Sequence, residues 1–427
     1  MIDIEQIRKN PDRFRHAIAV KGIPLDLDAL LEADERRRTL GKEVNQLREH
    51  RNRIAKQAGA EPDKREVLSR EGRAVGDKLA MLEVELNKWT TSFEQLMTYV
   101  PSLPAKDVPV GETDRDNVEI RRSGSPVGKD FALKDHLDLA KRHDMVDFEG
   151  ARQIAGSRAY ALKGTGALLE MAVLRFALDR LVEKGFTPVL PPLLVKHNAM
   201  YGTGYFPLGE DNAYEFEKDG LYLTGTSEVG MVAMNANRVL EIETLPLKLV
   251  GISPCFRREA GAAGRDTRGL YRVHQFQKVE QVVFCQNDPE VSAKEHYALL
   301  QNSEEIVQAL ELPYRVVAVC TGDMGMGQVR KHDIETWMPS RDSYGETHSC
   351  STFHDFQARR LGIRYTQDNQ QNGGKQKQYV HTLNNTAIAS PRILIALLEN
   401  HQNEDGSIHI PVALRPYLNG RTILEPK

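Results

Sequence analysis

Apolar residues in the first part of the chain follow two long runs with alternating steps of three and four residues. The earlier run extends from Leu30 to Ala58, and the later run, which keeps this spacing without exception, extends from Val75 to Val100. A Gly-Ala-Glu-Pro segment at 59–62 separates them. Because this spacing places apolar side chains along one helix face, we predict an antiparallel coiled-coil hairpin over about residues 28–100.

The segments on either side of the hairpin have a different pattern. Residues 1–27 predict a short helical cap with a break at Asn10-Pro11, and Pro101 cannot continue the second long helix. Residues 105–130 are polar and rich in Gly and Pro, with one short strand expected near 118–120. We therefore predict an N-terminal domain over 1–104, a linker over 105–130 and a globular domain over 131–427.

Strands and helices of the globular domain alternate without a regular βαβ order, which predicts an α+β fold with an antiparallel sheet and flanking helices. Helical spacing occurs at 168–184, 290–310 and 393–400. The segment at 186–195 is apolar but contains prolines, which favours an edge strand or an interface segment. Other strands are expected at 247–252, 273–284, 314–319, 333–338 and 379–384, and a loop at 364–378.

Composition limits the class of protein. The 427 residues are 40% hydrophobic and 27% charged, which is typical of a globular chain. There is no apolar run of about 18 residues to span a membrane, and the first ten residues are too polar for a signal peptide, so we expect a cytoplasmic protein without membrane partners. Four cysteines lie far apart without a CxxC pair, which indicates neither a disulfide framework nor a zinc site.

Charge is unevenly distributed along the chain. Residues 35–73 hold twelve Lys or Arg against seven Asp or Glu, a net of +5, whereas the whole chain carries −3. A basic, rigid arm suggests contact with a nucleic-acid backbone. A solvated coiled-coil surface and a dimerisation device remain open from the charges alone.

Residues 245–284 hold the strongest candidate chemistry. An apolar strand ends at Arg257, and a basic, glycine-rich loop leads into a return strand on which Phe276, Lys278 and Glu280 share one face. Arginines beside an aromatic face and carboxylates suit a nucleoside triphosphate together with a small zwitterion. An ordinary charged hairpin is the alternative. The chain lacks both the GxxxxGK[ST] phosphate loop and the GxGxxG spacing, so neither common nucleotide cradle is available.

Several motifs occur in a characteristic order. They are TSE at 226–228, FRREAG at 256–261, GRDTRG at 264–269, VHQFQKVE at 273–280, ETHSCSTFHDFQARR at 346–360 and HTLNNT at 381–386 followed by Arg392. With these motifs and the preceding arm, the chain closely resembles bacterial-type seryl-tRNA synthetases, a family of class II aminoacyl-tRNA synthetases, over nearly its whole length. The resemblance implies a class II antiparallel catalytic domain. It also implies a homodimer built on the helix ending at Gly185 and the strand holding Pro191.

The resemblance implies serine–tRNA ligase activity through a seryl-adenylate, with ATP, L-serine and serine tRNA as substrates. Selenocysteine tRNA would be a second substrate if the host has one. Arg257, Glu259 and Arg392 would be the catalytic residues, with Arg257 on the α-phosphate, Glu259 on the adenine amino group and Arg392 over the base. The full ATP-binding set is Arg257, Arg258, Glu259, Val273, Phe276, Glu346, Thr347, His348, Ser349 and Arg392.

Further roles follow from the same resemblance. Glu346 and Ser349 would hold Mg²⁺, which prefers oxygen ligands. Thr226, Ser227 and Glu228 would surround the serine ammonium group, while Glu280 and Thr386 would receive its hydroxyl. The basic loop at 264–272 would close over the triphosphate or meet the acceptor end of the tRNA.

The chain departs from the common family pattern at a few positions. Asn385-Thr386 replaces a frequent Gly-Ser and keeps the hydroxyl, Pro391 replaces a Gly, and Gly345 stands where an Arg is frequent. Three alternative functions make different demands on the sequence. A ligase that loads an amino acid onto a carrier protein would lack the long arm, an inactive tRNA-binding protein would not need the intact charged residues, and a zinc-dependent serine site would need clustered Cys and His ligands.

Overall fold

The computed structural model describes all residues except 1, 127, 263–268 and 369–373. The chain divides into two compact units, Met1–Pro101 and Ser102–Lys427. None of the described helices is both long and apolar enough to cross a membrane.

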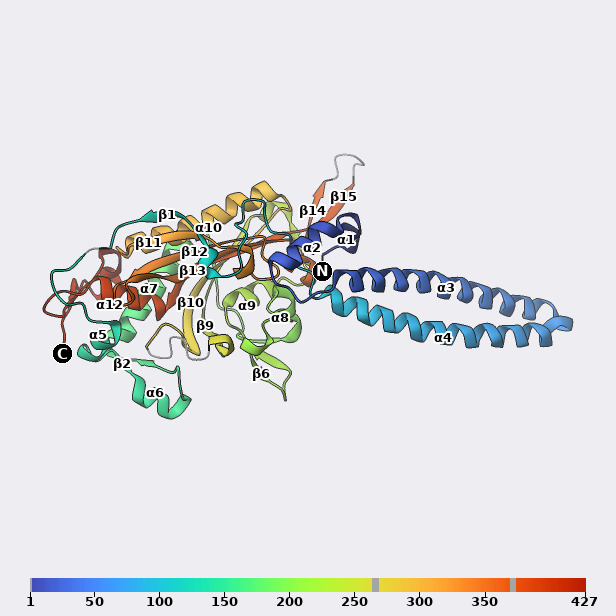
Figure 1. The fold of residues 1–427 in the computed structure, drawn as a ribbon, viewed down its shortest axis with the longest axis horizontal. Coiled ribbons are helices and arrows are strands. Elements are labelled where there is room, and N and C mark those ends of the chain that lie inside the picture. The colour runs from blue at the N-terminus through green and yellow to red at the C-terminus, as the bar shows by residue number, and fades with distance from the viewer. Residues whose placement is uncertain (1, 127, 263–268, 369–373) are drawn as a thin grey trace. The chain divides into compact units, whose positions relative to one another are not determined.

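The N-terminal unit is helical, as the heptad spacing predicts. Two short helices, α1 (Ile4–Lys9) and α2 (Pro11–Val20), precede the long helices α3 (Leu27–Ala60) and α4 (Arg65–Met97), which lie side by side in Figure 1. The Asp26 carboxylate accepts hydrogen bonds from the backbone N–H groups of Asp28 and Ala29 and so caps the start of α3. A 3₁₀ turn, η1 (Pro62–Lys64), reverses the chain. The predicted coiled-coil hairpin is therefore confirmed.

The second unit is organised around a large, mostly antiparallel sheet. Within the described residues, eight strands follow the order β1-β11-β12-β13-β16-β10-β9-β4, and only β4 runs parallel to its neighbour. Their bounds are β1 (Val118–Ser123), β4 (Thr187–Val189), β9 (Leu247–Phe256), β10 (Gln275–Cys285), β11 (Tyr314–Ala318), β12 (Arg330–Met338), β13 (Ser343–His354) and β16 (His381–Ser390). The proline-containing segment forms an edge strand, β4, as predicted.

Helices cover both faces of this sheet. On one face, α7 (Gly164–Glu183), α10 (Pro289–Ala309) and α12 (Arg392–Asn400) pack over the main apolar core. On the other, α9 (Ser227–Ala233) and α11 (Phe356–Leu361) pack against β9, β10, β13 and β16 and leave part of this face for a cavity. This antiparallel α+β architecture agrees with the predicted fold class.

Alternation along β10 decides which side chains meet the cavity. Phe276, Lys278 and Glu280 line it, and the next two even-numbered residues, Val282 and Phe284, are buried with the apolar side chains of α9 and α11. The odd-numbered residues Val279, Val283 and Cys285 of the same strand belong to the main core on the opposite face. The shared face inferred from the sequence is thus confirmed.

The prediction of a loop at 364–378 is wrong. β14 (Arg364–Asp368) and β15 (Lys375–Tyr379) pair as an antiparallel hairpin, and β14 also pairs with β8 (Val239–Glu241). The sequence did not predict these strands because their composition is polar. β15 is largely exposed, and Tyr365 of β14 is fully buried and anchors the hairpin. Residues 105–130, expected as a linker, contribute β1 to the edge of the large sheet.

Shorter elements complete the second unit. Two-stranded and three-stranded pairings join β2 to β3, β17 to β18, and β5 and β6 to β7. Their bounds, with those of the remaining helices, are α5 (His136–Arg142), β2 (Val146–Asp147), α6 (Phe148–Ala155), β3 (Ala161–Leu162), β5 (Leu194–Lys196), α8 (His197–Thr203), β6 (Tyr214–Phe216), β7 (Leu221–Leu223), β17 (Ile408–His409) and β18 (Ile423–Leu424).

Candidate active site

A cavity of about 280 Å³ opens on the same face of the sheet as α9 and α11, over the part of that face that the two helices leave uncovered. It is bounded by the ends of β9 and β10, the middle of β13, the end of β16 and the first residue of α12. Most of the predicted site residues meet here, although they come from segments far apart in the sequence. They are Glu228, Arg257, Glu259, Val273, Phe276, Glu280, Glu346, Thr347, His348, Ser349, Thr386 and Arg392.

Three predicted residues lie outside the cavity lining. Thr226 is fully buried, and its hydroxyl accepts a hydrogen bond from the backbone N–H of Glu228 as the N-cap of α9. Ser227 is also buried and packs close to Gly251 of β9. Arg258 is exposed, and its backbone N–H donates to the carbonyl oxygen of Asn212. Residues 264–268 of the basic loop lie outside the described part of the chain.

The ends of β9 and β10 hold a cation beside an aromatic ring. The Arg257 guanidinium lies 5.2 Å from the centre of the Phe276 ring, and the Arg257 backbone N–H donates to the His274 carbonyl oxygen at 2.9 Å. Glu259 adopts a φ of +54°, a left-handed conformation that is costly for a residue with a side chain. Its carboxylate pairs with Arg272 at 3.4 Å. This end can bind a flat base and an anionic group together.

The opposite end of the cavity is deeply buried and polar. Lys278 Nζ lies 2.6 Å from Glu280 Oε2, and the Thr386 hydroxyl donates to the same oxygen at 3.2 Å. Glu280 is only 2% exposed. A buried ion pair with a hydroxyl partner is costly to leave incompletely satisfied, so this end should favour a small ligand that adds hydrogen bonds to it.

Glu228 is a second buried carboxylate at this end. Gln357 donates to it at 2.7 Å, and the Tyr205 hydroxyl lies 3.4 Å away. Burial, and secondarily the nearby charge of Glu280, raises the pKa of Glu228 to about 7, while the hydrogen bond from Gln357 opposes this rise. A ligand cation beside Glu228 would relieve the cost of its negative charge.

Arg392 and Glu346 form the third part of the site. The Arg392 guanidinium donates to the Glu346 backbone carbonyl at 2.8 Å and lies 3.7 Å from its carboxylate. It also lies 4.3 Å from the centre of the Tyr271 ring. Partial desolvation raises the pKa of the half-exposed Glu346 carboxylate, but the charges of Arg392, Lys331 and other cations outweigh this and hold the pKa below its usual value. Glu346 is therefore ionised at neutral pH and can bind a cation.

The donors beside Glu346 suit a hard metal ion. The Glu346 carboxylate and Ser349 both line the cavity, and Asp333, opposite Ser349 on the neighbouring strand β12, has a buried carboxylate oxygen without a hydrogen-bond partner among the described residues. The described residues contain no group of three or more His, Cys, Asp or Glu that could hold a metal ion by itself. An all-oxygen pair that leaves most of the coordination sphere to water and phosphate fits Mg²⁺.

His348 lines the cavity but is poorly suited to proton transfer. Its ring is buried, with Nδ1 2.8 Å from the Thr347 hydroxyl. Burial lowers the pKa of His348 to about 4, so the ring is neutral at physiological pH. A neutral imidazole with this pKa is a weak base. This favours chemistry by positioning and charge neutralisation over proton transfer by His348.

Four residues with direct contacts in the site received no role from the sequence. Lys278 and Asn384 had a detectable signal, because each lies two residues from a predicted site residue on the same strand and therefore shares its face. Tyr205 and Gln357 had none. Gln357 lies on α11 and bonds Thr203, Glu228 and Thr382, a junction that only the folded chain creates.

An antiparallel sheet that carries a buried carboxylate pocket beside a guanidinium–aromatic end is the arrangement of a class II aminoacyl-tRNA synthetase. In agreement, residues 214–401 match the tRNA synthetase class II core domain (G, H, P, S and T). Residues 1–104 match the seryl-tRNA synthetase N-terminal domain. The chain belongs to the seryl-tRNA synthetase family.

Individual relatives support this assignment over the whole length. The serine–tRNA ligase of Deinococcus radiodurans is 48% identical, with 99% of each chain covered. That of Symbiobacterium thermophilum is 43% identical, with 98% of each covered. Among solved structures, seryl-tRNA synthetase from Pyrococcus horikoshii complexed with ATP has a TM-score of 0.91 and 39% identity, with 100% of each chain covered. The cytoplasmic serine–tRNA ligase from Naegleria fowleri in complex with AMP has a TM-score of 0.86 and 28% identity, covering 100% of this chain and 99% of that one.

Proposed function

We propose a division of labour among the cavity residues for the reaction of this family, the ATP-dependent joining of serine to tRNA. The chain is a serine–tRNA ligase by its family membership. The observation that carries the division is the contrast within one cavity. The buried oxygens of Glu228, Glu280 and Thr386 line the same cavity as the more accessible guanidinium groups of Arg257 and Arg392.

ATP would occupy the guanidinium end. Phe276 offers a flat face for the adenine, and Glu259 accepts from its amino group. Arg257 then binds the α-phosphate and the serine carboxylate, since a guanidinium can donate two parallel hydrogen bonds to each kind of anion. Arg392 covers the other side of the base and neutralises the terminal phosphate. Arg258, Val273, Thr347 and His348 complete the proposed ATP-binding set.

Mg²⁺ would be held by Glu346 and Ser349. When bound, it neutralises charge on the triphosphate and orients its oxygens. Glu346 keeps its negative charge for this purpose because neighbouring cations lower its pKa.

L-Serine would occupy the buried end. Its ammonium group faces Glu228, with Thr226 and Ser227 shaping the start of α9 that carries this carboxylate. Its hydroxyl bonds Glu280 and Thr386. Alanine would leave the Lys278–Glu280 pair and the Thr386 hydroxyl without the added partner, so the site rejects it by the cost of unpaired buried groups.

The reaction then proceeds in two displacements. An oxygen of the serine carboxylate attacks the α-phosphorus, the bond to the β-phosphate oxygen breaks, and seryl-adenylate and pyrophosphate form. The terminal ribose hydroxyl of the tRNA next attacks the seryl carbonyl and displaces AMP. Arg257 and Arg392 stabilise the charge that gathers on phosphate oxygens during the first step.

The hairpin of α3 and α4 would select the tRNA. Residues 35–73 carry a net charge of +5, which suits the phosphate backbone of serine tRNA, recognised by shape. Selenocysteine tRNA, assembly as a homodimer and a cytoplasmic location belong to this proposal.

Exchange of labelled pyrophosphate into ATP, followed by charging of bulk tRNA, tests the proposal. We expect exchange with serine, exchange at least about 100-fold weaker with alanine, which lacks the hydroxyl, and charging of serine tRNA. Exchange without charging would favour the ligase that loads a carrier protein. No exchange with any amino acid would leave an inactive tRNA-binding protein and overturn the proposed roles.

A further inference from the structure

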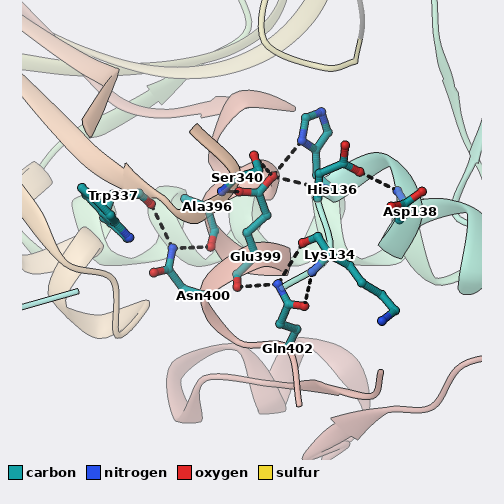
Figure 2. A network of polar contacts seen from close by, with 10 residues as sticks. Lys134, His136, Asp138, Trp337, Ser340, Ala396, Glu399, Asn400 and Gln402 are labelled. Carbon is teal, nitrogen blue, oxygen red and sulfur yellow. Dashed lines mark hydrogen bonds and ion pairs between the residues drawn. The ribbon is translucent and has the colours of Figure 1, made fainter. Parts of the chain in front are cut away.

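A carboxylate that contacts neither end of the cavity is buried at the end of α12. Glu399 is 0% exposed and lies near the C-terminal end of the helix that Arg392 begins. Figure 2 shows it at the centre of a network that joins this helix to the start of α5 and to the turn η7 (Pro339–Arg341). Burying a carboxylate is costly unless several donors satisfy it, so its contacts should have a purpose beyond filling space.

Two segments donate to Glu399. His136 donates both its backbone N–H and its ring Nδ1 to Oε1, each at 2.9 Å. Ser340 donates its hydroxyl to Oε1 at 2.7 Å and its backbone N–H to Oε2 at 2.9 Å. A carboxylate that accepts four hydrogen bonds holds both segments at fixed distances from α12.

The first branch reaches the end of the basic loop. An ionised carboxylate only accepts hydrogen bonds, so Nδ1 of His136 donates to Glu399 and Nε2 is the ring nitrogen on the other side. Nε2 is buried and has no partner among the described residues. It lies against Gly269, where a Cβ atom would come within 2.4 Å of it, and Gly269 adopts a φ of +84°. The imidazole therefore packs directly against the backbone where the described chain resumes after residue 268.

The second branch reaches the same place from η7. Ser340 is followed by Arg341, whose guanidinium lies 4.2 Å from the centre of the Tyr271 ring. The Arg392 guanidinium lies 4.3 Å from the same ring, and its Nε donates to the Tyr271 carbonyl oxygen at 3.3 Å. Leu270, between Gly269 and Tyr271, is buried with Met338 and with Ile395 of α12. Both branches from Glu399 thus converge on residues 269–271 and return to Arg392.

We propose that Glu399 is a positioning residue for the ATP end of the site: through His136 and Ser340 it fixes residues 269–271, and these fix the Arg392 guanidinium. Neither Glu399 nor His136 lines the cavity. A displacement of about 1 Å in a group that binds the transition state can reduce the rate by roughly 10²-fold, so a remote anchor of this kind acts on catalysis. Among the described residues, the hydrogen bonds of the Glu399 carboxylate reach only His136 and Ser340 and none of the residues of the serine end, so that end should be unaffected.

Two variants and one control test the proposal in the full-length chain. Glu399→Gln keeps the size of the side chain but replaces one accepting oxygen with a donor, which must then face a donor of Ser340 or His136. His136→Asn keeps a donor near the position of Nδ1 but removes the ring that packs against Gly269. Gln402→Ala is the matched control. Gln402 bonds the backbone N–H and carbonyl of Lys134, each at 2.9 Å, and donates to the backbone carbonyl of Glu399 at 3.0 Å, so its loss removes neighbouring polar contacts but keeps both branches from the Glu399 carboxylate.

The measurement is the KM for ATP and for serine in pyrophosphate exchange, with thermal unfolding beside it. We expect both variants to raise the KM for ATP at least about tenfold and to change the KM for serine less than about twofold. Gln402→Ala should lower the unfolding temperature and leave both KM values near wild type. If Glu399→Gln does not fold, His136→Asn decides the question because it retains the bond to Glu399. KM values for ATP equal to those of the control would overturn the proposal.

The proposal rests on the proposed function, and the same assay separates their failures. Absence of serine-dependent exchange in the wild-type protein would count against the function itself. Normal wild-type exchange with unaffected variants would remove only the role assigned to Glu399.

Discussion

The hairpin of α3 and α4 and the catalytic sheet bury their residues in different ways. In the hairpin, burial follows one seam that includes Leu40 and Val44 of α3 and Leu79 and Phe93 of α4. The cavity instead collects side chains from residue 203 to residue 392. A repetitive seam can be shortened without changing the remainder, whereas a site assembled from distant strands loses its geometry when one strand moves. Recognition of tRNA and activation of serine should therefore be separable by mutation.

Shortening the hairpin should produce the largest effect. Arg48 of α3 and Glu83 of α4 are paired at 2.7 Å, so a cut just beyond them removes both helices at one level. Replacing residues 49–82 with a short Gly-Ser turn should reduce charging of serine tRNA by roughly 10³-fold, because many phosphate contacts are lost together. Exchange of pyrophosphate should stay within about threefold of wild type. Equal loss of both activities would show that the hairpin supports the catalytic unit and would end the comparison.

The second prediction concerns the serine end. Thr386→Val keeps the shape of the side chain and removes the hydroxyl that bonds Glu280. We expect kcat/KM for serine in the exchange assay to fall by about 10–100-fold, the cost of leaving one buried polar group unpaired, with little change in the KM for ATP.

Thr336→Val is a suitable control for that substitution. The Thr336 hydroxyl is buried in β12 and has no partner in the described part of the chain, so its removal should be neutral or mildly stabilising. Equal losses in the two variants would mean that any threonine in the sheet matters, and the role of Thr386 would be rejected.

These comparisons also explain what could be predicted from the sequence. The helical period alone predicted the hairpin, because its buried residues recur at regular steps of three and four along one face of each helix. Strand alternation correctly placed Phe276, Lys278 and Glu280 on one face. No period links residues from separate elements, so the bond from Gln357 to Glu228 and the one from His136 to Glu399, which spans 263 positions, were invisible. The hairpin of β14 and β15 was missed because its polar side chains face solvent.

A third, smaller effect should appear in the pH dependence of serine binding. Burial raises the pKa of Glu228 from its ordinary value of 4.5 to about 7, so the folded chain holds a proton there that the unfolded chain releases. This group's contribution to stability therefore falls as pH rises from about 4.5 to 7. The serine ammonium group favours the ionised carboxylate. As pH rises toward 7, the KM for serine should therefore fall by up to about tenfold per pH unit, and above pH 7 it should level off.

Glu228→Gln provides the comparison for this profile. The variant should bind serine weakly at every pH, and its KM for serine should be nearly flat between pH 5.5 and 8 because no carboxylate titrates. The KM for ATP, measured in the same assays, reports on groups at the other end of the cavity. A slope that persists in the variant would assign the titration to another group.

The smallest effect should come from the base of the hairpin, where one carboxylate holds three guanidinium groups. Asp34 is 1% exposed and accepts from Arg8 at 2.7 Å, Arg37 at 3.0 Å and Arg38 at 3.1 Å. Burial raises the pKa of Asp34, but the hydrogen bonds from Arg8 and Arg37 outweigh it and lower the pKa. The stability that the ionised carboxylate contributes is therefore lost as pH falls through its pKa in the folded chain.

Asp34→Asn should lower the free energy of unfolding of the helical hairpin by about 1–3 kcal/mol, as measured by circular dichroism during urea titration. Asp12→Asn, which breaks an exposed pair with Arg15, should cost less than about 0.5 kcal/mol. Exchange should be normal in both variants, because the hairpin takes no part in activating serine; reduced exchange in Asp34→Asn alone would show that the base of the hairpin influences the catalytic unit.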